Sequence, residues 1–191
     1  MDALTILGPM EPTTPVCLWW QDETRLGLHL PVGRRITAHG VKPLKVMAPC
    51  YQYSWLYAAV QPVTGETFWL DLPRLDTACF QLFLDHFSQQ QPHALHLLVL
   101  DNAPAHVARA VTPPANVILI HLPPYCPELN PVERLWQHLK RTLTDLAATT
   151  RFTFNTLRQA VDQFVQSITP AQVTSLTSFP YIRKIMQVDS G

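Results

Sequence analysis

Three acidic residues occupy positions from which carboxylates could act together. Asp22 and Asp101 each end an apolar run typical of a buried β-strand, and Glu133 lies in the first turn of a strongly amphipathic helical segment. In open α/β sheets the reactive groups gather at the carboxyl ends of such strands. We therefore expect the two aspartates to meet at one edge of a sheet, where a helix that crosses this edge can bring Glu133 to them.

Three carboxylates in one cleft repel one another, and protons or cations must relieve that repulsion. A pair of Mg²⁺ or Mn²⁺ ions is the natural solution because hard cations prefer carboxylate oxygens. Two such ions, about 3.5–4 Å apart, activate a water or a 3′-hydroxyl and stabilise the leaving oxygen in phosphodiester cleavage. This reaction needs neither a histidine base nor a cysteine nucleophile.

Glu133 also has a purely structural interpretation. Asn130 can cap the helix, Pro131 suits its first position, and Glu133 follows at capping-box spacing. Its carboxylate would then bond to a backbone N–H and interact with the helix dipole. Both interpretations share one apolar stripe: Val132, Leu135, Trp136, Leu139, Leu143 and Leu146.

The elements that would position these acids follow from hydrophobic periodicity. Strands are predicted at residues 16–22, 25–30, 52–61, 66–72, 94–101 and 117–122. Helices are predicted at residues 76–90, 104–110, 131–146 and 155–168, with a loosely patterned tail after them. The buried face of the first helix is expected to hold Ala78, Cys79, Leu82, Phe83, His86 and Phe87. This order predicts an α/β fold, a mixed sheet with helices on both faces.

Composition places the chain among single-domain proteins without a membrane segment. It has 191 residues, of which 47% are hydrophobic, and no apolar run approaches the roughly 20 residues of a membrane helix. The start lacks the pattern of a signal peptide, and we expect a cytoplasmic location. The four cysteines, Cys17, Cys50, Cys79 and Cys126, form no C-x-x-C pair, as is typical of reduced thiols.

The charge distribution leaves room for a nucleic-acid partner although the net charge is zero. No acidic residue lies between Thr24 and Gly65, whereas this stretch contains Arg25, Arg34, Arg35, Lys42 and Lys45. A local basic surface that binds phosphates is one interpretation. An ordinary solvated hairpin and loop is the other.

Two segments resemble the signature of mariner-type DDE transposases, in particular their bacterial insertion-sequence branch. They are Asp101-Asn-Ala-Pro-Ala-His106 and Leu122-Pro-Pro-Tyr-Cys-Pro-Glu-Leu-Asn-Pro-Val-Glu-Arg-Leu-Trp136. Trp20-Gln-Asp22-Glu23 and Gly33-Arg-Arg…His39-Gly-Val-Lys-Pro43 are similar to that family's first-aspartate block and following loop. The resemblance implies a ribonuclease H-like fold, two divalent metal ions, DNA as partner, cutting and joining of transposon ends, and a homodimer.

Carried over by position, the resemblance makes Asp22, Asp101 and Glu133 the catalytic, metal-binding acids. It gives Asn102 and His106 orienting or DNA-contact roles, and it places Arg34, Arg35, Lys42 and Lys45 in a DNA-binding loop. Glu23 is excluded because it follows Asp22 on a strand and must point to the opposite face. Glu128 is excluded because it lies in the proline loop before the helix. The family has either aspartate or glutamate at that loop position, so Glu133 is the better choice.

The domain organisation follows from the same resemblance. We expect a leader with little structure at residues 1–15, a ribonuclease H-like DDE catalytic domain at 16–183 and a tail at 184–191. The family's helix-turn-helix region has no counterpart here, which predicts a separately encoded half or a truncated copy in a bacterial, nucleoid-associated protein. The leading hypothesis is a DDE transposase catalytic domain. The alternatives are a remnant that binds nucleic acid without cleaving it and a ribonuclease H-like nuclease that acts alone.

Overall fold

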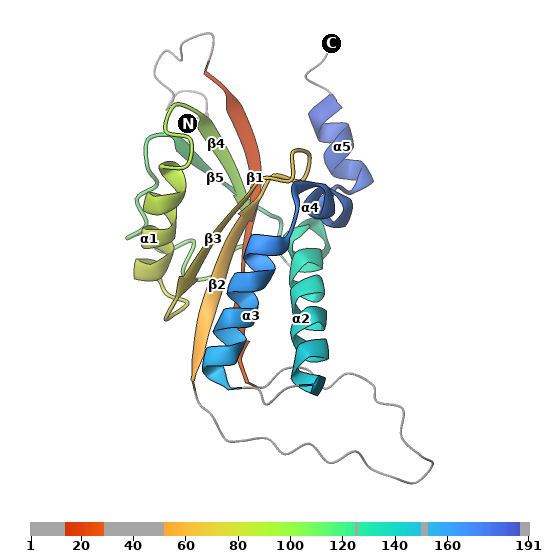
Figure 1. The fold of residues 1–191 in the computed structure, drawn as a ribbon. Coiled ribbons are helices and arrows are strands. Elements are labelled where there is room, and N and C mark those ends of the chain that lie inside the picture. The colour runs from red at the N-terminus through yellow and green to blue at the C-terminus, as the bar shows by residue number, and fades with distance from the viewer. Residues whose placement is uncertain (1–13, 29–51, 125, 150–152, 188–191) are drawn as a thin grey trace.

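A five-stranded mixed sheet forms the centre of the protein (Figure 1). The computed structural model describes residues 14–28, 52–124, 126–149 and 153–187. In sheet order the strands are β3 (Thr67–Leu72), β2 (Tyr53–Val60), β1 (Val16–Gly27), β4 (Leu95–Leu100) and β5 (Val117–His121). β1 pairs antiparallel with β2 and parallel with β4, while β2–β3 is antiparallel and β4–β5 is parallel.

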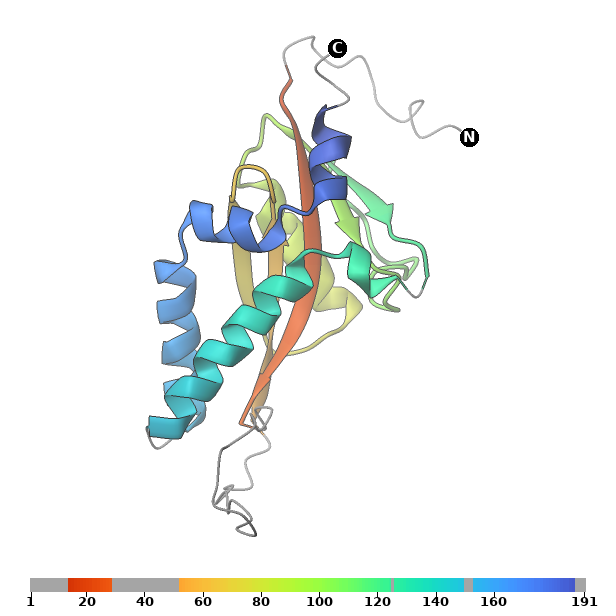
Figure 2. The same cartoon turned by 90° about the vertical axis from the view of Figure 1, so that its right-hand side faces the viewer.

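Helices cover both faces of the sheet, so the predicted α/β fold class is confirmed (Figures 1 and 2). One face carries α1 (Thr77–Ser88). The other carries α2 (Val132–Thr149), α3 (Phe154–Ser167), α4 (Pro170–Thr177) and α5 (Pro180–Gln187). None of the helices in the described ranges has the length and apolar composition needed to cross a bilayer.

Strand β1 separates two apolar cores because successive side chains on a strand point to opposite faces. Trp20 and Leu26 pack in the core beneath α2 and α3, whereas Trp19 packs in the core beneath α1. Asp22 shares its parity with Trp20, and Glu23 shares its parity with Trp19. The two neighbouring acids of β1 are therefore directed to different faces of the sheet.

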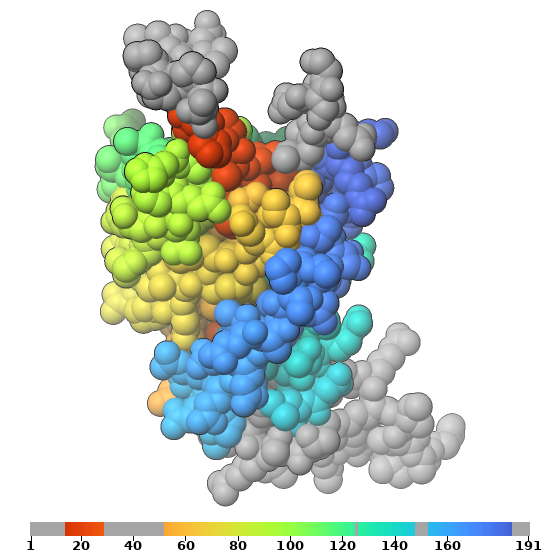
Figure 3. Space-filling model, turned by 45° about the horizontal axis from the view of Figure 1, so that its top comes forward, coloured from red at the N-terminus to blue at the C-terminus, as the bar shows by residue number. Residues whose placement is uncertain are grey.

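The β2–β3 hairpin and helix α4 are held together by close backbone contact. Gly65 lies in the hairpin turn with a φ of 76°, and an added Cβ would lie 2.1 Å from the carbonyl oxygen of Pro170. Only glycine fits both the backbone conformation and the space. Figure 3 shows the resulting contact, in which the α3–α4 segment lies against the hairpin.

Two predicted elements near the site are wrong. Residues 25–27 do not return as a separate strand, because β1 continues to Gly27 and stays paired with β2 from Trp20↔Val60 to Gly27↔Tyr53. No glycine or proline interrupts that ladder. The predicted helix 104–110 is a single turn, in which the Ala103 carbonyl accepts from the N–H groups of His106 and Val107. One isolated turn does not propagate without further support.

Two other expectations also need correction. The tail forms α4 and α5, whose Val173 and Ile182 are buried, and α5 crosses the expected boundary at residue 183. Helices of two turns show too little periodicity to be recognised in a sequence. In α1 the buried face holds Phe80, Phe83, Leu84 and Phe87, whereas Leu82 is exposed.

Candidate active site

Asp22 projects from β1 toward α2. Its Oδ2 accepts a hydrogen bond of 2.9 Å from Nε1 of Trp136, a fully buried side chain on α2. Burial, followed by the negative charges of Glu23 and Glu133, raises the pKa of Asp22 to about 8 from its ordinary 3.8. Asp22 is thus a carboxylate whose surroundings disfavour its negative charge.

Asp101 follows β4 at the level of Asp22. The parallel register pairs Trp20 with Val99, and each aspartate lies two residues further along its strand. Adjacent strands are about 4.7–4.9 Å apart, so the register alone makes the two acids neighbours. Oδ1 of Asp101 accepts from the Ala103 N–H at 2.9 Å and from His106 Nδ1 at 2.8 Å. The bond from His106 holds the pKa of Asp101 below its ordinary value.

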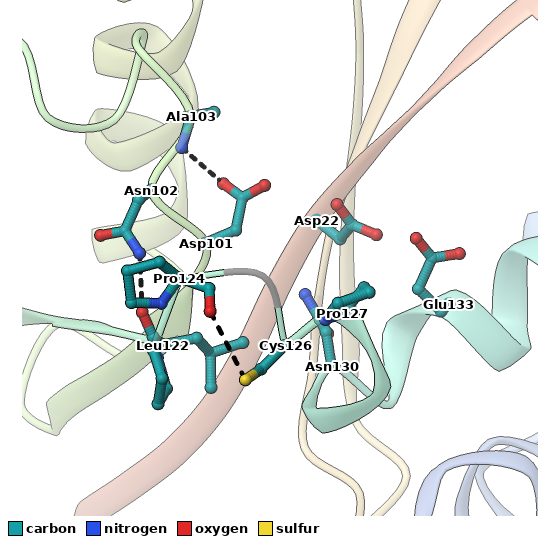
Figure 4. Close-up of a pocket in the computed structure, with 11 residues that line it drawn as sticks. Asp22, Asp101, Asn102, Ala103, Leu122, Pro124, Cys126, Pro127, Asn130 and Glu133 are labelled. Atoms are coloured by element: carbon teal, nitrogen blue, oxygen red, sulfur yellow. Dashed lines mark hydrogen bonds between the residues drawn. The ribbon is translucent and has the colours of Figure 1, made fainter.

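Glu133 reaches the site from the first turn of α2. The 3-10 turn η2 (Pro127–Leu129) precedes it, and Oδ1 of Asn130 accepts from the Val132 N–H at 3.1 Å, which caps the helix. The Asn130 N–H donates to the Pro127 carbonyl instead of to Glu133, so the capping box is not formed. Figure 4 shows the Glu133 carboxylate pointing toward Asp22, with Asp101 directed into the same space.

The three acids line one hollow of about 430 Å³, together with Asn102, Cys126 and Asn130. They come from three elements that are far apart in the sequence: β1, the end of β4 and the start of α2. The convergence predicted for Asp22, Asp101 and Glu133 is therefore observed (Figure 4).

The donors of this hollow fit a hard divalent cation. They are carboxylates, and burial, followed by the negative charges of Glu23 and Glu133, raises the pKa of Asp22. In the described part of the chain, no three His, Cys, Asp or Glu side chains lie close enough to hold one ion between them. Mg²⁺ commonly takes only one or two carboxylates and keeps several waters.

The other predicted site residues fall into three groups. Asn102 lines the hollow, and its Nδ2 donates to the Leu122 carbonyl at 2.7 Å. His106 is buried, which favours the orienting role over DNA contact. The four basic residues Arg34, Arg35, Lys42 and Lys45 lie outside the described residues.

His106 is placed between two acids. Its side chain is 1% exposed, and Nε2 lies 2.8 Å from Oε1 of Glu23 while Nδ1 bonds to Asp101. Burial alone would lower the pKa of His106, but the hydrogen bonds to Asp101 and Glu23 and their charges raise it to about 9. With a pKa of about 9 the ring is an imidazolium at neutral pH, in which both ring nitrogens donate.

Residues 17–153 match the sequence model of a family described as DDE superfamily endonuclease. The chain belongs to this DDE endonuclease family. The match begins in β1 and ends just after α2, so it includes all three acids of the hollow.

Other proteins share parts of this DDE domain. Uncharacterized protein y4pE/y4sA of Sinorhizobium fredii is 37% identical over 89 residues, which cover 46% of this chain and 66% of that one. A pre-cleavage Mos1 transpososome matches with a TM-score of 0.63 and 14% identity over 84% of this chain and 52% of the other. The Mos1 mariner paired end complex with Mn gives a TM-score of 0.62 and 16% identity over 84% and 51%.

These structural matches establish the fold of the DDE domain as ribonuclease H-like, as the resemblance implied. The chain spans about half the length of the Mos1 chains that it matches.

Sequence reasoning missed three contributors to the site. Trp136 was assigned to the apolar stripe, but its indole N–H bonds to Asp22. Glu23 was excluded on parity, which is correct for its direction, yet it contacts His106. Asn130 was expected only as a cap, and its Nδ2 also donates to the Gln21 carbonyl at 2.9 Å. The two-residue period of a strand, which places Glu23 on the same face as Trp19, was a usable signal for the second of these.

Proposed function

We propose that this chain is the catalytic domain of an insertion-sequence transposase, which cleaves DNA strands at transposon ends and transfers them to target DNA. The observation that carries the proposal is the convergence of Asp22, Asp101 and Glu133 on one hollow in a member of the DDE endonuclease family. The Mos1 structures with the same fold are described as a transpososome and a paired end complex, which supports a partner of the same kind here.

Asp22, Asp101 and Glu133 would hold two Mg²⁺ or Mn²⁺ ions, with Asp22 and Asp101 bound to both ions and Glu133 to one of them. Such ions supply an activated water or 3′-hydroxyl and stabilise the leaving oxygen of the phosphodiester. The protein's own part is to hold the acids in place. Trp136 fixes one oxygen of Asp22, His106 and the Ala103 N–H fix Oδ1 of Asp101, and the Asn130 cap fixes the first turn that presents Glu133.

The partners and boundaries follow from the proposed activity. We propose DNA contacts from Asn102 at the hollow and from Arg34, Arg35, Lys42 and Lys45. A homodimer and a separately encoded helix-turn-helix half complete the proposed assembly. We propose a catalytic domain from residue 16 to residue 183, and the buried Ile182, which ties α5 to the core beneath α2, supports the inclusion of α5 in it.

A nicking assay tests the proposal. The purified chain is incubated with supercoiled plasmid carrying the ends of the insertion sequence, in Mg²⁺, in Mn²⁺ and in EDTA. We expect relaxed circles with either metal and none in EDTA. Asp101→Ala should abolish cleavage, whereas Glu128→Gln, an exposed acid of η2 outside the hollow, should cleave like the wild type.

DNA binding without cleavage in any metal would contradict the proposal and support a non-cleaving remnant. Cleavage that survives Asp101→Ala would contradict the assigned site. Cleavage of any supercoiled DNA at the same rate, with no joining to a target, would instead favour a nuclease that acts alone.

A further inference from the structure

Glu23 is a buried carboxylate on the face of the sheet opposite the hollow. Its side chain is 5% exposed, and Oε1 contacts both His106 Nε2, at 2.8 Å, and the donating Nε2 of Gln21, at 2.7 Å. Its parity on β1 directs it into the aromatic core beneath α1. Burying a charge there is unfavourable unless it is paired, and an apolar side chain would stabilise such a core as well or better. Fold stability alone therefore does not account for an acid at this position.

We propose that Glu23 is a positioning residue that ties the second acid of the site to the third. The inference rests on the proposed function, because it concerns how that site holds its metal ligands. Glu23 acts through a path of hydrogen bonds that we call the brace. The brace runs through Asp101, His106, Glu23, Gln21 and Asn130 to the start of α2.

The Asp101 end of the brace sets the orientation of one carboxylate. Both described bonds to Asp101 fall on Oδ1, from the Ala103 N–H and from His106. These bonds fix the rotation of the carboxylate and direct Oδ2 away from Ala103 and His106. His106 is in turn held from its other nitrogen by Glu23 and packed on Phe80, with ring centroids 4.4 Å apart. Rotation of the ring or of the Asp101 carboxylate would break a hydrogen bond of the buried His106 side chain.

The other end of the brace reaches the helix that carries Glu133. Gln21 donates to Glu23 through its side chain, and its main-chain carbonyl accepts from Asn130 Nδ2 at 2.9 Å. The same Asn130 side chain accepts from the Val132 N–H. Because alternate residues of β1 face opposite sides, Gln21 and Glu23 support the site from behind while Asp22 lies within it.

Binding of Mn²⁺ to the intact chain provides a readout that does not depend on turnover. The concentration of free Mn²⁺ is measured by electron paramagnetic resonance while the protein is titrated with Mn²⁺. We expect Glu23→Gln to weaken Mn²⁺ binding about tenfold, the lower end of what residues behind metal ligands contribute. Cleavage should recover to within a few-fold of wild type once Mn²⁺ is saturating, because the ligands themselves remain.

Tyr57→Phe is the matched control. Tyr57 is buried on the same face of the sheet, opposite Glu23 in the β1–β2 ladder, and the change removes one hydrogen bond, to the Arg74 carbonyl, that is not part of the brace. It should lower the Tm without changing Mn²⁺ affinity. If Glu23→Gln lowers the Tm and leaves Mn²⁺ affinity at the level of Tyr57→Phe, Glu23 only stabilises the fold and the inference is wrong.

Two substitutions of His106 keep the test usable if Glu23→Gln does not fold. His106→Asn places an amide donor near the position of Nδ1 and removes the bond to Glu23, whereas His106→Gln places one near Nε2 and removes the bond to Asp101. The brace predicts weaker Mn²⁺ binding in both. It also predicts that adding Glu23→Gln to His106→Asn has little further effect, since contacts in one path are not additive. Full additivity, or wild-type affinity in His106→Asn, would overturn it.

The two proposals fail in different ways. A wild-type chain that binds no Mn²⁺ would overturn the proposed function and the brace together. A wild-type chain that binds Mn²⁺ and cleaves DNA, with unaltered Mn²⁺ affinity in Glu23→Gln and in His106→Asn, would overturn the brace alone.

Discussion

The two faces of β1 give neighbouring carboxylates opposite electrostatic environments. Asp22 faces α2 and accepts a neutral indole N–H from Trp136, with Glu23 and Glu133 as nearby negative charges. Glu23 faces α1 and contacts the imidazolium of His106 at 2.8 Å. Among the described residues, Glu23 therefore has a cationic partner, whereas the charged neighbours of Asp22 are the acids Glu23 and Glu133.

This difference distinguishes an acid that is balanced by a protein cation from an acid that is suited to bind a metal ion. A buried carboxylate beside a protein cation is balanced within the fold. A carboxylate whose pKa is raised to about 8 by burial and by like charges lacks that balance, and a bound divalent cation would supply it. On this account, the face of β1 toward α2 is the one that would bind metal, through Asp22. The face toward α1 supports the site, through Glu23.

The largest expected effect comes from removing the charge of Asp22. Asp22→Asn should lower metal-dependent cleavage by about 10³-fold, because losing a shared ligand removes several kcal/mol of transition-state stabilisation. Glu23→Gln should lower cleavage far less at saturating Mn²⁺. Single-turnover nicking rates measure both. Equal losses in the two variants would remove the distinction between the faces.

The next effect concerns the two acids that flank Asn130. Glu133→Gln should reduce cleavage by about 10²-fold, because Glu133 would serve one ion of the pair. Glu128→Gln should behave like the wild type, since Glu128 is exposed on η2 and does not line the hollow. The same nicking assay compares them. A loss confined to Glu128→Gln would reassign the third acid.

A smaller effect is expected from two buried tryptophans on opposite faces. Trp136→Phe removes the N–H donor to Asp22 and should slow cleavage by about tenfold, corresponding to about 1.4 kcal/mol. Trp19→Phe removes an indole bond to His96 Nδ1 in the core beneath α1. Trp19→Phe should lower the free energy of unfolding by a similar amount, which is measured as a lower Tm, and should leave cleavage unchanged. Slower cleavage in Trp19→Phe would contradict the assignment of faces.

The smallest effect is a pH dependence of stability in the metal-free protein. The folded pKa values of Asp22, about 8, and His106, about 9, both lie above their ordinary values of 3.8 and 6.5. Between pH 6.5 and 8 the folded state therefore binds more protons than the unfolded state, and stability falls as pH rises.

Asp22→Asn should remove the part of this fall that belongs to Asp22. The Tm in EDTA, recorded by scanning calorimetry from pH 5 to pH 9, should decline less in Asp22→Asn than in the wild type, by about 2–4 °C. A wild-type Tm that increases over this range would show that the pKa of Asp22 is not raised in the folded protein.

Much of the fold could be predicted because its elements carry strong local patterns. The apolar run that becomes β4 is almost fully buried, and the stripe from Val132 to Leu143 belongs to the long helix α2. The run that becomes β5 was apolar enough to be recognised although only Val117 of this strand is buried. α4 and α5 have two turns each, too short for a pattern. The buried face of α1 was misjudged because its aromatic side chains outweigh the more regular face that contains Leu82.

The three acids could be predicted together because each ends an apolar run or begins a helix, although β1 itself continues past Asp22 to Gly27. Their support could not, because it depends on tertiary contacts between distant residues. Trp136 and Asp22 are 114 positions apart, and His106 and Glu23 are 83 apart. Nothing local distinguishes an indole N–H that meets a carboxylate from one that meets solvent. The parity of β1 indicated where Glu23 points and left open what it would contact.

Anomalous diffraction from crystals of the chain grown with Mn²⁺ tests the central claim most directly. The account predicts two manganese peaks in the hollow of Asp22, Asp101 and Glu133, with Asp22 bound to both and His106 bound to neither. Manganese beside Glu23, or a hollow without manganese in crystals that bind it elsewhere, would contradict the account.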